Sequence, residues 1–279
     1  MTKLLAASLQ YVRRMFAIFL VFLVVASTWL FTQRVWWLPD LASLHGADVD
    51  RVFLITLAIT GLLFIILQGI LAFVTFRYAA GRTKQVRHWI GPRLEKRFAL
   101  IAGIIIFGVD VTLYALGDSR WVYFWGTPPP GTPIIEVMGE QFAWNFRYAG
   151  PDGVFGKTDP TLISSTNPFG LDKTDPAAKD DILSINQLHL PEGKPIRLRI
   201  RSHDVIHSFY LPYQRIKQDA VPGMQIELWF VPRKTGQYEI ACSQLCGLGH
   251  YRMRAFLTVE SQQDYDKWLR GQAEPAIGN

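Results

Sequence analysis

Three long apolar runs lie within the first 117 residues and constrain the fold more than any other feature of the chain. They are Met15–Gln33, Val52–Phe76 and Phe98–Leu116. A helix needs roughly 20 mostly apolar residues to cross the hydrocarbon core of a bilayer, and each run approaches or exceeds that length. We therefore expect residues 1–117 to form a transmembrane region with helices at about 15–33, 52–76 and 98–116.

The first apolar run has two interpretations. It follows Arg13 and Arg14, as a signal peptide would, but it is longer than the 7–15 apolar residues of a usual signal peptide. Arg34-Val-Trp-Trp after it is typical of an interfacial anchor. We favour a retained helix, and a cleaved leader remains the alternative.

Charge is distributed unevenly and predicts the topology. Residues 1–117 contain 12 Lys and Arg against 5 Asp and Glu, whereas residues 118–279 contain 17 against 18. Much of the excess lies between the second and third runs, and short basic loops stay in the cytoplasm. The chain after Leu116 is then expected on the outer, periplasmic side of a bacterial cytoplasmic membrane. Its near neutrality argues against nucleic-acid binding.

The second half of the chain has the pattern of an all-β domain. A Pro- and Gly-rich linker is expected at 118–133, and the strict alternation over 196–201 predicts a strand with one buried face. Seven short strands separated by turn residues predict a β-sandwich or barrel. They are expected at 134–138, 141–148, 182–190, 195–202, 225–231, 237–241 and 254–260, with an irregular excursion at 150–181. Ser261 is a candidate N-cap for a helix in the terminal segment 261–279.

Both cysteines of the chain fall in one twelve-residue segment, Cys242-Ser-Gln-Leu-Cys246-Gly-Leu-Gly-His250-Tyr-Arg-Met253. Thiolates, imidazole and thioether are the ligands that favour copper. A second cysteine four residues after the first allows both sulfurs to bridge two copper ions, and His207 is the best candidate for a further nitrogen ligand. A disulfide and a Cys₂His₂ zinc site are the alternatives, although a thioether is a poor zinc ligand.

Four segments, in order, resemble subunit II of the haem-copper cytochrome c oxidases. They are Gly139-Glu-Gln-Phe-Ala-Trp144-Asn-Phe-Arg-Tyr148, Asp204-Val-Ile-His207-Ser-Phe, Lys217-Gln-Asp219-Ala-Val-Pro-Gly223 and the cysteine segment. The resemblance covers most of residues 98–260. It implies a membrane-anchored all-β protein, with transmembrane helices followed by a cupredoxin-like β-sandwich that holds copper at 134–260.

The resemblance also implies a site and partners. A binuclear copper centre, CuA, would be bridged by Cys242 and Cys246 and completed by His207, His250, Met253 and the backbone carbonyl of Gln244. Electrons would come from cytochrome c and leave, through His250, for the haem of subunit I. Oxygen reduction and proton pumping would take place there, with no catalytic residue in this chain. Subunit III is a further expected partner.

Two departures from the family pattern affect this expectation. Gln244 stands where many relatives carry glutamate, and a neutral amide is a weaker ligand for a hard cation, which weakens the case for magnesium at the subunit I interface. Phe142-Ala-Trp144 replaces the usual Trp-Tyr-Trp, so electron entry is assigned to Phe142 or Trp144 as a hypothesis. Glu95 lies where the family places a carboxylate at a proton pathway, and a solvated surface charge is the alternative.

Other functions remain as alternatives. A quinol oxidase subunit of the same fold typically lacks the copper ligands, and a soluble nitrous oxide reductase domain would have no membrane runs. A copper-delivery module is a third possibility. The chain has no Cys-x-x-Cys-His motif for haem attachment, so the electron donor is expected to be a separate protein or another subunit. The remaining histidines are expected to be ordinary surface or interfacial residues: His45, His88, His189 and His203.

Overall fold

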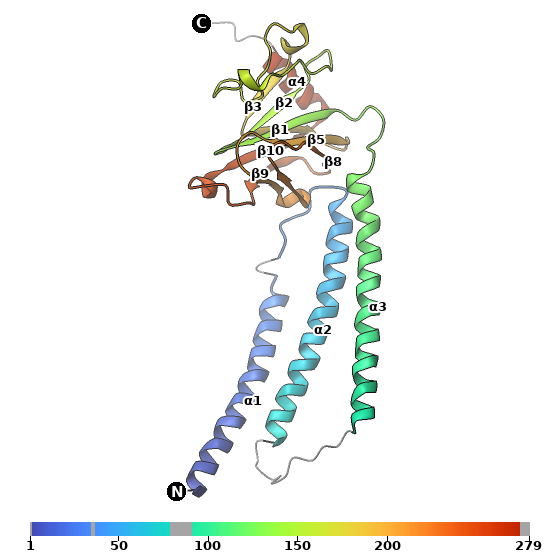
Figure 1. The fold of residues 1–279 in the computed structure, drawn as a ribbon, viewed down its shortest axis with the longest axis vertical. Coiled ribbons are helices and arrows are strands. Elements are labelled where there is room, and N and C mark those ends of the chain that lie inside the picture. The colour runs from blue at the N-terminus through green and yellow to red at the C-terminus, as the bar shows by residue number, and fades with distance from the viewer. Residues whose placement is uncertain (1, 35–36, 79–90, 274–279) are drawn as a thin grey trace. The chain divides into compact units, whose positions relative to one another are not determined.

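The computed structural model describes residues 2–34, 37–78 and 91–273 (Figure 1). The chain divides into two compact units. One contains residues 1–37 and 50–117, and the other contains residues 38–49 and 118–279. The first unit is helical and the second is mostly β, which confirms the predicted fold class.

Three helices are long and apolar enough to cross a membrane. They are α1 (Thr2–Thr32), α2 (Gly46–Tyr78) and α3 (Pro92–Trp125). Most of their apolar side chains are exposed, as expected for surfaces that meet lipid or other membrane helices. Part of the predicted basic loop, together with His88, lies outside the described residues.

Helix α3 continues beyond the apolar run that predicted it. The segment Asp118–Trp125 contains neither glycine nor proline, so nothing in it interrupts the helix. The helix ends just before Gly126, which is followed by Pro128, Pro129 and Pro130. Proline removes a backbone donor and restricts the residue before it. The first part of the segment expected as a linker is therefore helical.

Ten strands form two five-stranded sheets in the described part of the β unit. The first sheet has the order β3-β2-β1-β5-β8, and the second has the order β4-β10-β9-β6-β7. The strands of the first sheet are β1 (Ile134–Glu140), β2 (Ala143–Tyr148), β3 (Ile182–Ile185), β5 (Ile196–Ser202) and β8 (Ile226–Phe230). The strands of the second are β4 (Gln187–Pro191), β6 (His207–Leu211), β7 (Ile216–Ala220), β9 (Gly236–Cys242) and β10 (Arg254–Glu260).

The core contains apolar side chains from both sheets. On β5, Ile196, Leu198 and Ile200 are fully buried, while the arginines between them are only partly buried. This is the alternation that predicted the strand, with one face on a core and one facing outward. Both sheets contribute to one continuous hydrophobic cluster, as in a β-sandwich.

The single strand predicted over 182–190 is wrong. Asn186 adopts a left-handed backbone conformation with φ of 57°, which asparagine tolerates better than most residues. Its side-chain oxygen accepts a hydrogen bond of 2.9 Å from the backbone N–H of Trp144. The residues before Asn186 form β3 beside β2, and those after it form β4 beside β10. The chain thus crosses from one sheet to the other at this residue.

Two strands and one turn were also missed by the sequence interpretation. Strand β6 is short and is followed by Pro212, and β7 has polar residues at its three central positions, so neither stands out as an apolar pattern. Gln141 and Phe142 form the turn between β1 and β2, and β2 begins only at Ala143. Strand β6 carries His207, and the turn lies against the cysteine segment.

The excursion at 150–181 has little regular structure, as expected, but it is anchored to the sandwich. The Arg147 guanidinium is almost fully buried and donates hydrogen bonds to Glu136, to Asp181 and to the backbone oxygen of Gly156. Two short 3₁₀ helices, η1 (Pro160–Leu162) and η2 (Pro176–Ala178), form part of the segment. Buried cations need such partners, because an unpaired buried charge is costly.

Helix α4 (Gln262–Ala273) closes the sandwich and is capped as predicted. The backbone N–H of Asp264 donates to the Ser261 hydroxyl, which in turn donates to the Asp264 carboxylate. Trp268 of this helix stacks on the His189 ring with a centroid distance of 4.1 Å. His189 is half-buried and packs against this helix. His189 and His45 were expected to be ordinary surface or interfacial residues; His45 is buried, at 3% exposure, so a surface position is wrong for His45.

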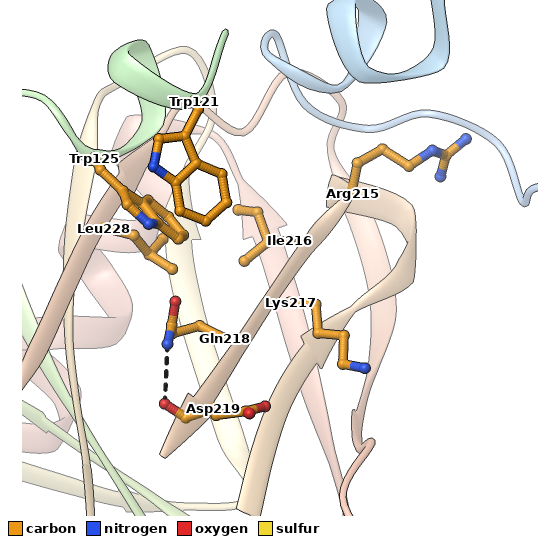
Figure 2. Close-up of a pocket in the computed structure, with 8 residues that line it drawn as sticks. All are labelled: Trp121, Trp125, Arg215, Ile216, Lys217, Gln218, Asp219 and Leu228. Atoms are coloured by element: carbon orange, nitrogen blue, oxygen red, sulfur yellow. Dashed lines mark hydrogen bonds between the residues drawn. The ribbon is translucent and has the colours of Figure 1, made fainter. Parts of the chain in front are cut away.

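A pocket of about 450 Å³ lies in the β unit between strand β7, Leu228 of β8 and the last turns of α3 (Figure 2). Trp121 and Trp125 form one wall, in an edge-to-face pair with centroids 5.0 Å apart. Figure 2 shows that Gln218 points toward this wall, whereas Lys217 points away from it. Trp121 and Trp125, in the part of α3 that belongs to the β unit, thus line this pocket together with β7.

Candidate metal centre

Adjacent strands bring the distant histidine to the cysteine segment. Strands β6 and β9 pair in antiparallel fashion, with Phe209 opposite Cys242. His207 lies two residues before Phe209 and therefore on the same face of β6. The cysteine segment then leaves the end of β9 and returns through the short 3₁₀ helix η4 (His250–Arg252) to β10. Residues 35 positions apart in sequence meet at this end of the sandwich.

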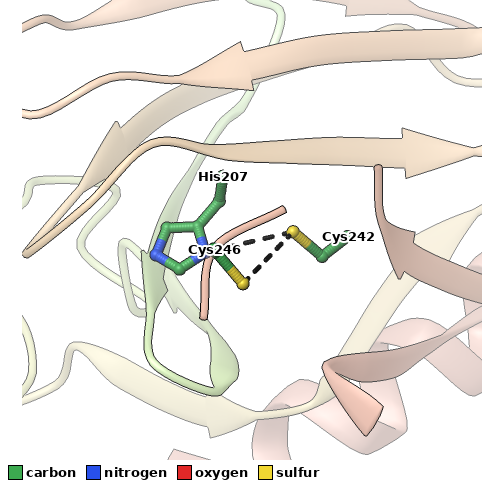
Figure 3. A group of neighbouring side chains, drawn as sticks. All are labelled: His207, Cys242 and Cys246. Carbon is green, nitrogen blue, oxygen red and sulfur yellow. Dashed lines mark hydrogen bonds between the residues drawn. The ribbon is translucent and has the colours of Figure 1, made fainter. Parts of the chain in front are cut away.

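The two thiols and the first imidazole form a compact cluster (Figure 3). The sulfur atoms of Cys242 and Cys246 are 3.9 Å apart and unbonded, which excludes the disulfide interpretation for this structure. The Nδ1 atom of His207 is 4.0 Å from the Cys242 sulfur. All three ligand atoms lie within 4.8 Å of one another, and all three residues are buried.

The other three predicted ligands surround the same sulfurs. The Nδ1 atom of His250 is 3.6 Å from the Cys246 sulfur, and the Met253 sulfur is 3.7 Å from it. The Cys242 thiol donates to the backbone oxygen of Gln244 at 3.2 Å. The donor atoms predicted from the sequence thus converge on the cysteine pair, although they come from two strands and a loop.

A carboxylate orients the first imidazole. Asp204 Oδ1 lies 2.8 Å from His207 Nε2, and Asp204 Oδ2 accepts a 2.7 Å hydrogen bond from the backbone N–H of Gln141. With Nε2 protonated toward the carboxylate, the lone pair of Nδ1 faces the sulfurs, which is the arrangement that ligating histidines need. Burial tends to raise the pKa of Asp204, but hydrogen bonds from His207, Gln141 and Val205 outweigh it and lower this pKa.

The two thiols differ in acidity. Burial disfavours the Cys242 thiolate, but hydrogen bonds from His207, from backbone groups and from His250 outweigh it and lower the pKa of Cys242 to about 6. Burial and the neighbouring Cys242 charge raise the pKa of Cys246 to about 11. Since the thiolate is the form that binds metal, Cys242 is ready to bind and Cys246 must lose its proton when a metal enters.

The donor set fits copper. A separation of 3.9 Å between the sulfurs is less than twice a metal–thiolate bond of about 2.3 Å, so one ion can contact both sulfurs. Two thiolates, two imidazoles and a thioether are soft or borderline ligands. The Met253 sulfur points into the cluster and is buried, which favours copper over zinc. Gln244 supplies its backbone oxygen from the same loop.

The outer surface of the loop is apolar. Leu245, Leu248 and Tyr251 expose 78%, 97% and 86% of their surface, whereas the cysteines and Met253 are buried and His250 is half-buried. Exposed apolar side chains in a group mark interaction surfaces more often than chance positions. The loop thus presents the sulfur ligands inward and these three apolar side chains outward.

The two candidate electron-entry residues occupy different depths. Trp144 is fully buried, with its ring 5.9 Å from the His207 ring and 5.0 Å from that of Phe209. Phe142 is only partly buried and covers the cysteine loop so closely that a Cβ atom on Gly249 would lie 2.4 Å from its ring. Phe142 is therefore the nearer of the two to the surface.

Glu95, Asp219 and His203 are not among the donors described above. Glu95 is in the first turn of α3 and is exposed. Asp219 lies on β7, opposite Ser208. His203 is half-exposed, with Nδ1 3.6 Å from Glu140, as expected for a surface residue.

Sequence reasoning assigned no role to Gln141. Its side chain donates a 2.6 Å hydrogen bond to the backbone oxygen of Cys246, and its backbone donates to Asp204. These partners are 105 and 63 residues away in sequence. No local pattern could have indicated them, beyond the position of Gln141 next to Phe142 in the aromatic motif.

The β unit matches a known family model. Residues 134–260 match the family described as cytochrome c oxidase subunit II, periplasmic domain. The chain is 37% identical over 259 residues to the alternative cytochrome c oxidase subunit 2 of Bradyrhizobium diazoefficiens, covering 92% of this chain and 91% of that protein. It is 27% identical over 280 residues to cytochrome c oxidase subunit 2 of a Synechocystis species, covering 91% and 80%.

A solved structure is also similar to part of the chain. It is the periplasmic domain of subunit II of cytochrome oxidase from Bradyrhizobium japonicum, with 28% sequence identity and a TM-score of 0.39. The match covers 52% of this chain and 96% of that domain.

Proposed function

The chain belongs to the cytochrome c oxidase subunit II family, and from that membership we propose that it is the electron-entry subunit of a haem-copper oxidase. It accepts single electrons from cytochrome c at a binuclear copper centre and passes them to the haem of subunit I. Oxygen is reduced to water in subunit I, and the reaction is coupled to proton pumping. This chain therefore carries electrons and does no bond chemistry.

The convergence of four further donors on two unbonded, buried thiols carries the proposal. Cys242, Cys246, His207 and His250 would hold the copper, and Met253 and the Gln244 carbonyl would be weak ligands. Bound copper supplies reversible one-electron chemistry. The protein holds the donors in place: His207 is fixed by Asp204, and both cysteines are held in or next to β9 and packed in the core. Such rigid ligands change little when an electron arrives.

The positions of the aromatic residues support an electron route. Phe142 at the surface of the loop is the proposed entry point, and Trp144 beneath it contacts His207. His250 is the proposed exit toward subunit I. The exposed apolar side chains of the loop offer a surface for that subunit.

The membrane unit supports assembly with other subunits. The exposed apolar faces of α1–α3 are available to subunit I and subunit III in a bacterial cytoplasmic membrane, with the copper unit on the periplasmic side. Glu95, at the start of α3, is the proposed proton-path residue. A magnesium ion at the subunit I interface is not part of the proposal, because Gln244 replaces the expected carboxylate.

Electron paramagnetic resonance of the copper-loaded, detergent-solubilised chain tests the proposal. One electron shared by two copper nuclei gives a seven-line hyperfine pattern, whereas one electron on a single nucleus gives four lines. Seven lines are expected. Four lines, or tightly bound zinc in the purified protein, would refute the binuclear assignment. Purification from membranes without any haem-bearing partner would favour the copper-delivery alternative.

A further inference from the structure

The turn between β1 and β2 contacts both halves of the metal centre through one residue. The backbone N–H of Gln141 donates to Asp204 Oδ2 at 2.7 Å, and the side-chain Nε2 donates to the Cys246 carbonyl at 2.6 Å. Asp204 in turn holds the His207 imidazole at 2.8 Å. Gln141 thus links the carboxylate that orients one ligand to the backbone of another.

The loop is shaped to receive this side chain. A Cβ atom on Gly247 would lie 2.7 Å from Gln141 Nε2, so a larger residue there would displace the amide. Gly247 also has φ of 142°, a conformation that other residues rarely adopt. Phe142, the next residue of the turn, fills the space over Gly249. The contact between the turn and the loop is therefore closely packed on both sides of the amide.

From these contacts we infer that Gln141 is a positioning residue for the metal centre. It fixes the distance between the imidazole of His207 and the sulfur of Cys246 by bonding to the support of each. The two ligands belong to different parts of the chain. The backbone of Ser243 bonds to Ser208 of β6, and Cys246 lies three residues further along the loop, where its carbonyl accepts the hydrogen bond from Gln141. The inference deepens the proposed function and rests on it for the metal-dependent part of its test.

Two variants isolate the side-chain bond. Gln141→Glu keeps the size of the side chain but places a carboxylate oxygen, which cannot donate, against the Cys246 carbonyl. Gln141→Ala removes the side chain, and both variants keep the backbone bond to Asp204. Gln237→Glu is the matched control, because Gln237 is exposed on β9 and the change in charge is the same.

Three measurements on the full-length, detergent-solubilised chain test the role. Hydrogen exchange of the metal-free protein is expected to be faster over residues 243–250 in both Gln141 variants. Copper release to a chelator is expected to be faster by about 2-fold to 13-fold, the range that one neutral hydrogen bond supplies. The copper hyperfine splitting is expected to differ from that of the unchanged protein, while the Gln237→Glu protein matches it in all three measurements.

The outcomes separate this inference from the proposed function. Unchanged exchange, release and splitting in both Gln141 variants would overturn the positioning role. A lower melting temperature with unchanged copper release and unchanged hyperfine splitting would also overturn it, because the side chain would then only stabilise the fold. If the unchanged protein gave no seven-line spectrum, the proposed function would fail, and hydrogen exchange of the metal-free loop would still decide whether Gln141 holds it.

Discussion

Replacing Asp204 is expected to weaken copper binding without removing any ligand. The carboxylate accepts hydrogen bonds from His207 Nε2 at 2.8 Å, from the Gln141 N–H at 2.7 Å and from the Val205 N–H at 2.7 Å. His207 and Val205 donate to one carboxylate oxygen and Gln141 donates to the other. Asp204→Asn keeps only one of these oxygens, so at least one donor then faces an NH₂ group. Asp204→Ala removes all three bonds.

The size of the effect follows from these contacts. Loss of a group that orients a metal-binding histidine typically costs 10-fold to 100-fold in metal affinity, or about 1.4–2.8 kcal/mol. We expect Asp204→Asn near the lower end of this range and Asp204→Ala near the upper end. Without the carboxylate, the His207 ring is free to place its proton on either nitrogen, and only one tautomer binds.

Competition against a chelator of known copper affinity measures the change in the full-length chain. Asp219→Asn is the control, because it removes the same charge from an exposed position on β7, the strand beside His207. Both Asp204 variants are expected to bind copper more weakly than the Asp219 variant. Equal affinities in all three proteins would show that the Asp204 contact does not orient the ligand, and the reasoning would be refuted.

Three further predictions test other parts of the molecule. Arg147→Met is expected to destabilise the β unit by about 3–5 kcal/mol, because it leaves the buried Asp181 carboxylate without its cation and removes one of the cations that pair with Glu136. Thermal unfolding should show a much smaller loss for Arg197→Met, whose side chain is 35% exposed. Burial lowers the pKa of His45 to about 4, although the nearby Asp48 carboxylate opposes this shift. The contribution of His45 to stability is therefore complete above about pH 6.5 and is lost as the pH falls toward 4. The melting temperature of the His45→Gln variant should depend less on pH in that window than the melting temperature of the unchanged protein. Phe142→Leu is expected to slow electron arrival at copper in stopped-flow mixing with reduced cytochrome c, and unchanged rates in both this variant and Trp144→Phe would exclude the proposed entry route.

The sequence predicted the ligands because most of them are local. Cys242, Cys246, His250 and Met253 fall within twelve residues, and their chemical types alone favour copper. The membrane helices were also predictable, since length and hydropathy are properties of single segments. His207 could be named as a candidate because copper needs a further nitrogen ligand, but its approach to the cysteines could not be predicted, because it lies 35 residues away on a strand that has no clear apolar pattern.

What could not be predicted depends on contacts between distant segments. The crossing at Asn186 follows from one left-handed residue and one hydrogen bond to Trp144, neither of which alters the apolar pattern of 182–190. Strand β7 is polar at its centre because it lies at the edge of its sheet, where one side has no neighbouring strand. A pattern of apolar residues indicates which segments are buried, but it does not indicate which of them pair.

The metal centre also combines ligands that are close together in the sequence with supporting contacts from distant residues. The loop supplies five of the six donor atoms and β6 supplies the sixth. Two of these ligands are held by residues outside the loop, His207 by Asp204 and Cys246 by Gln141. A twelve-residue loop with two glycines would otherwise change shape with the charge of the metal it holds. Because electron transfer is fastest when the ligands move little, the supports from the turn between β1 and β2 and from the segment between β5 and β6 are as necessary to an electron-carrying site as the ligands themselves. A loop transplanted to another sandwich without an equivalent of Gln141 and Asp204 should therefore bind copper but hold it less rigidly.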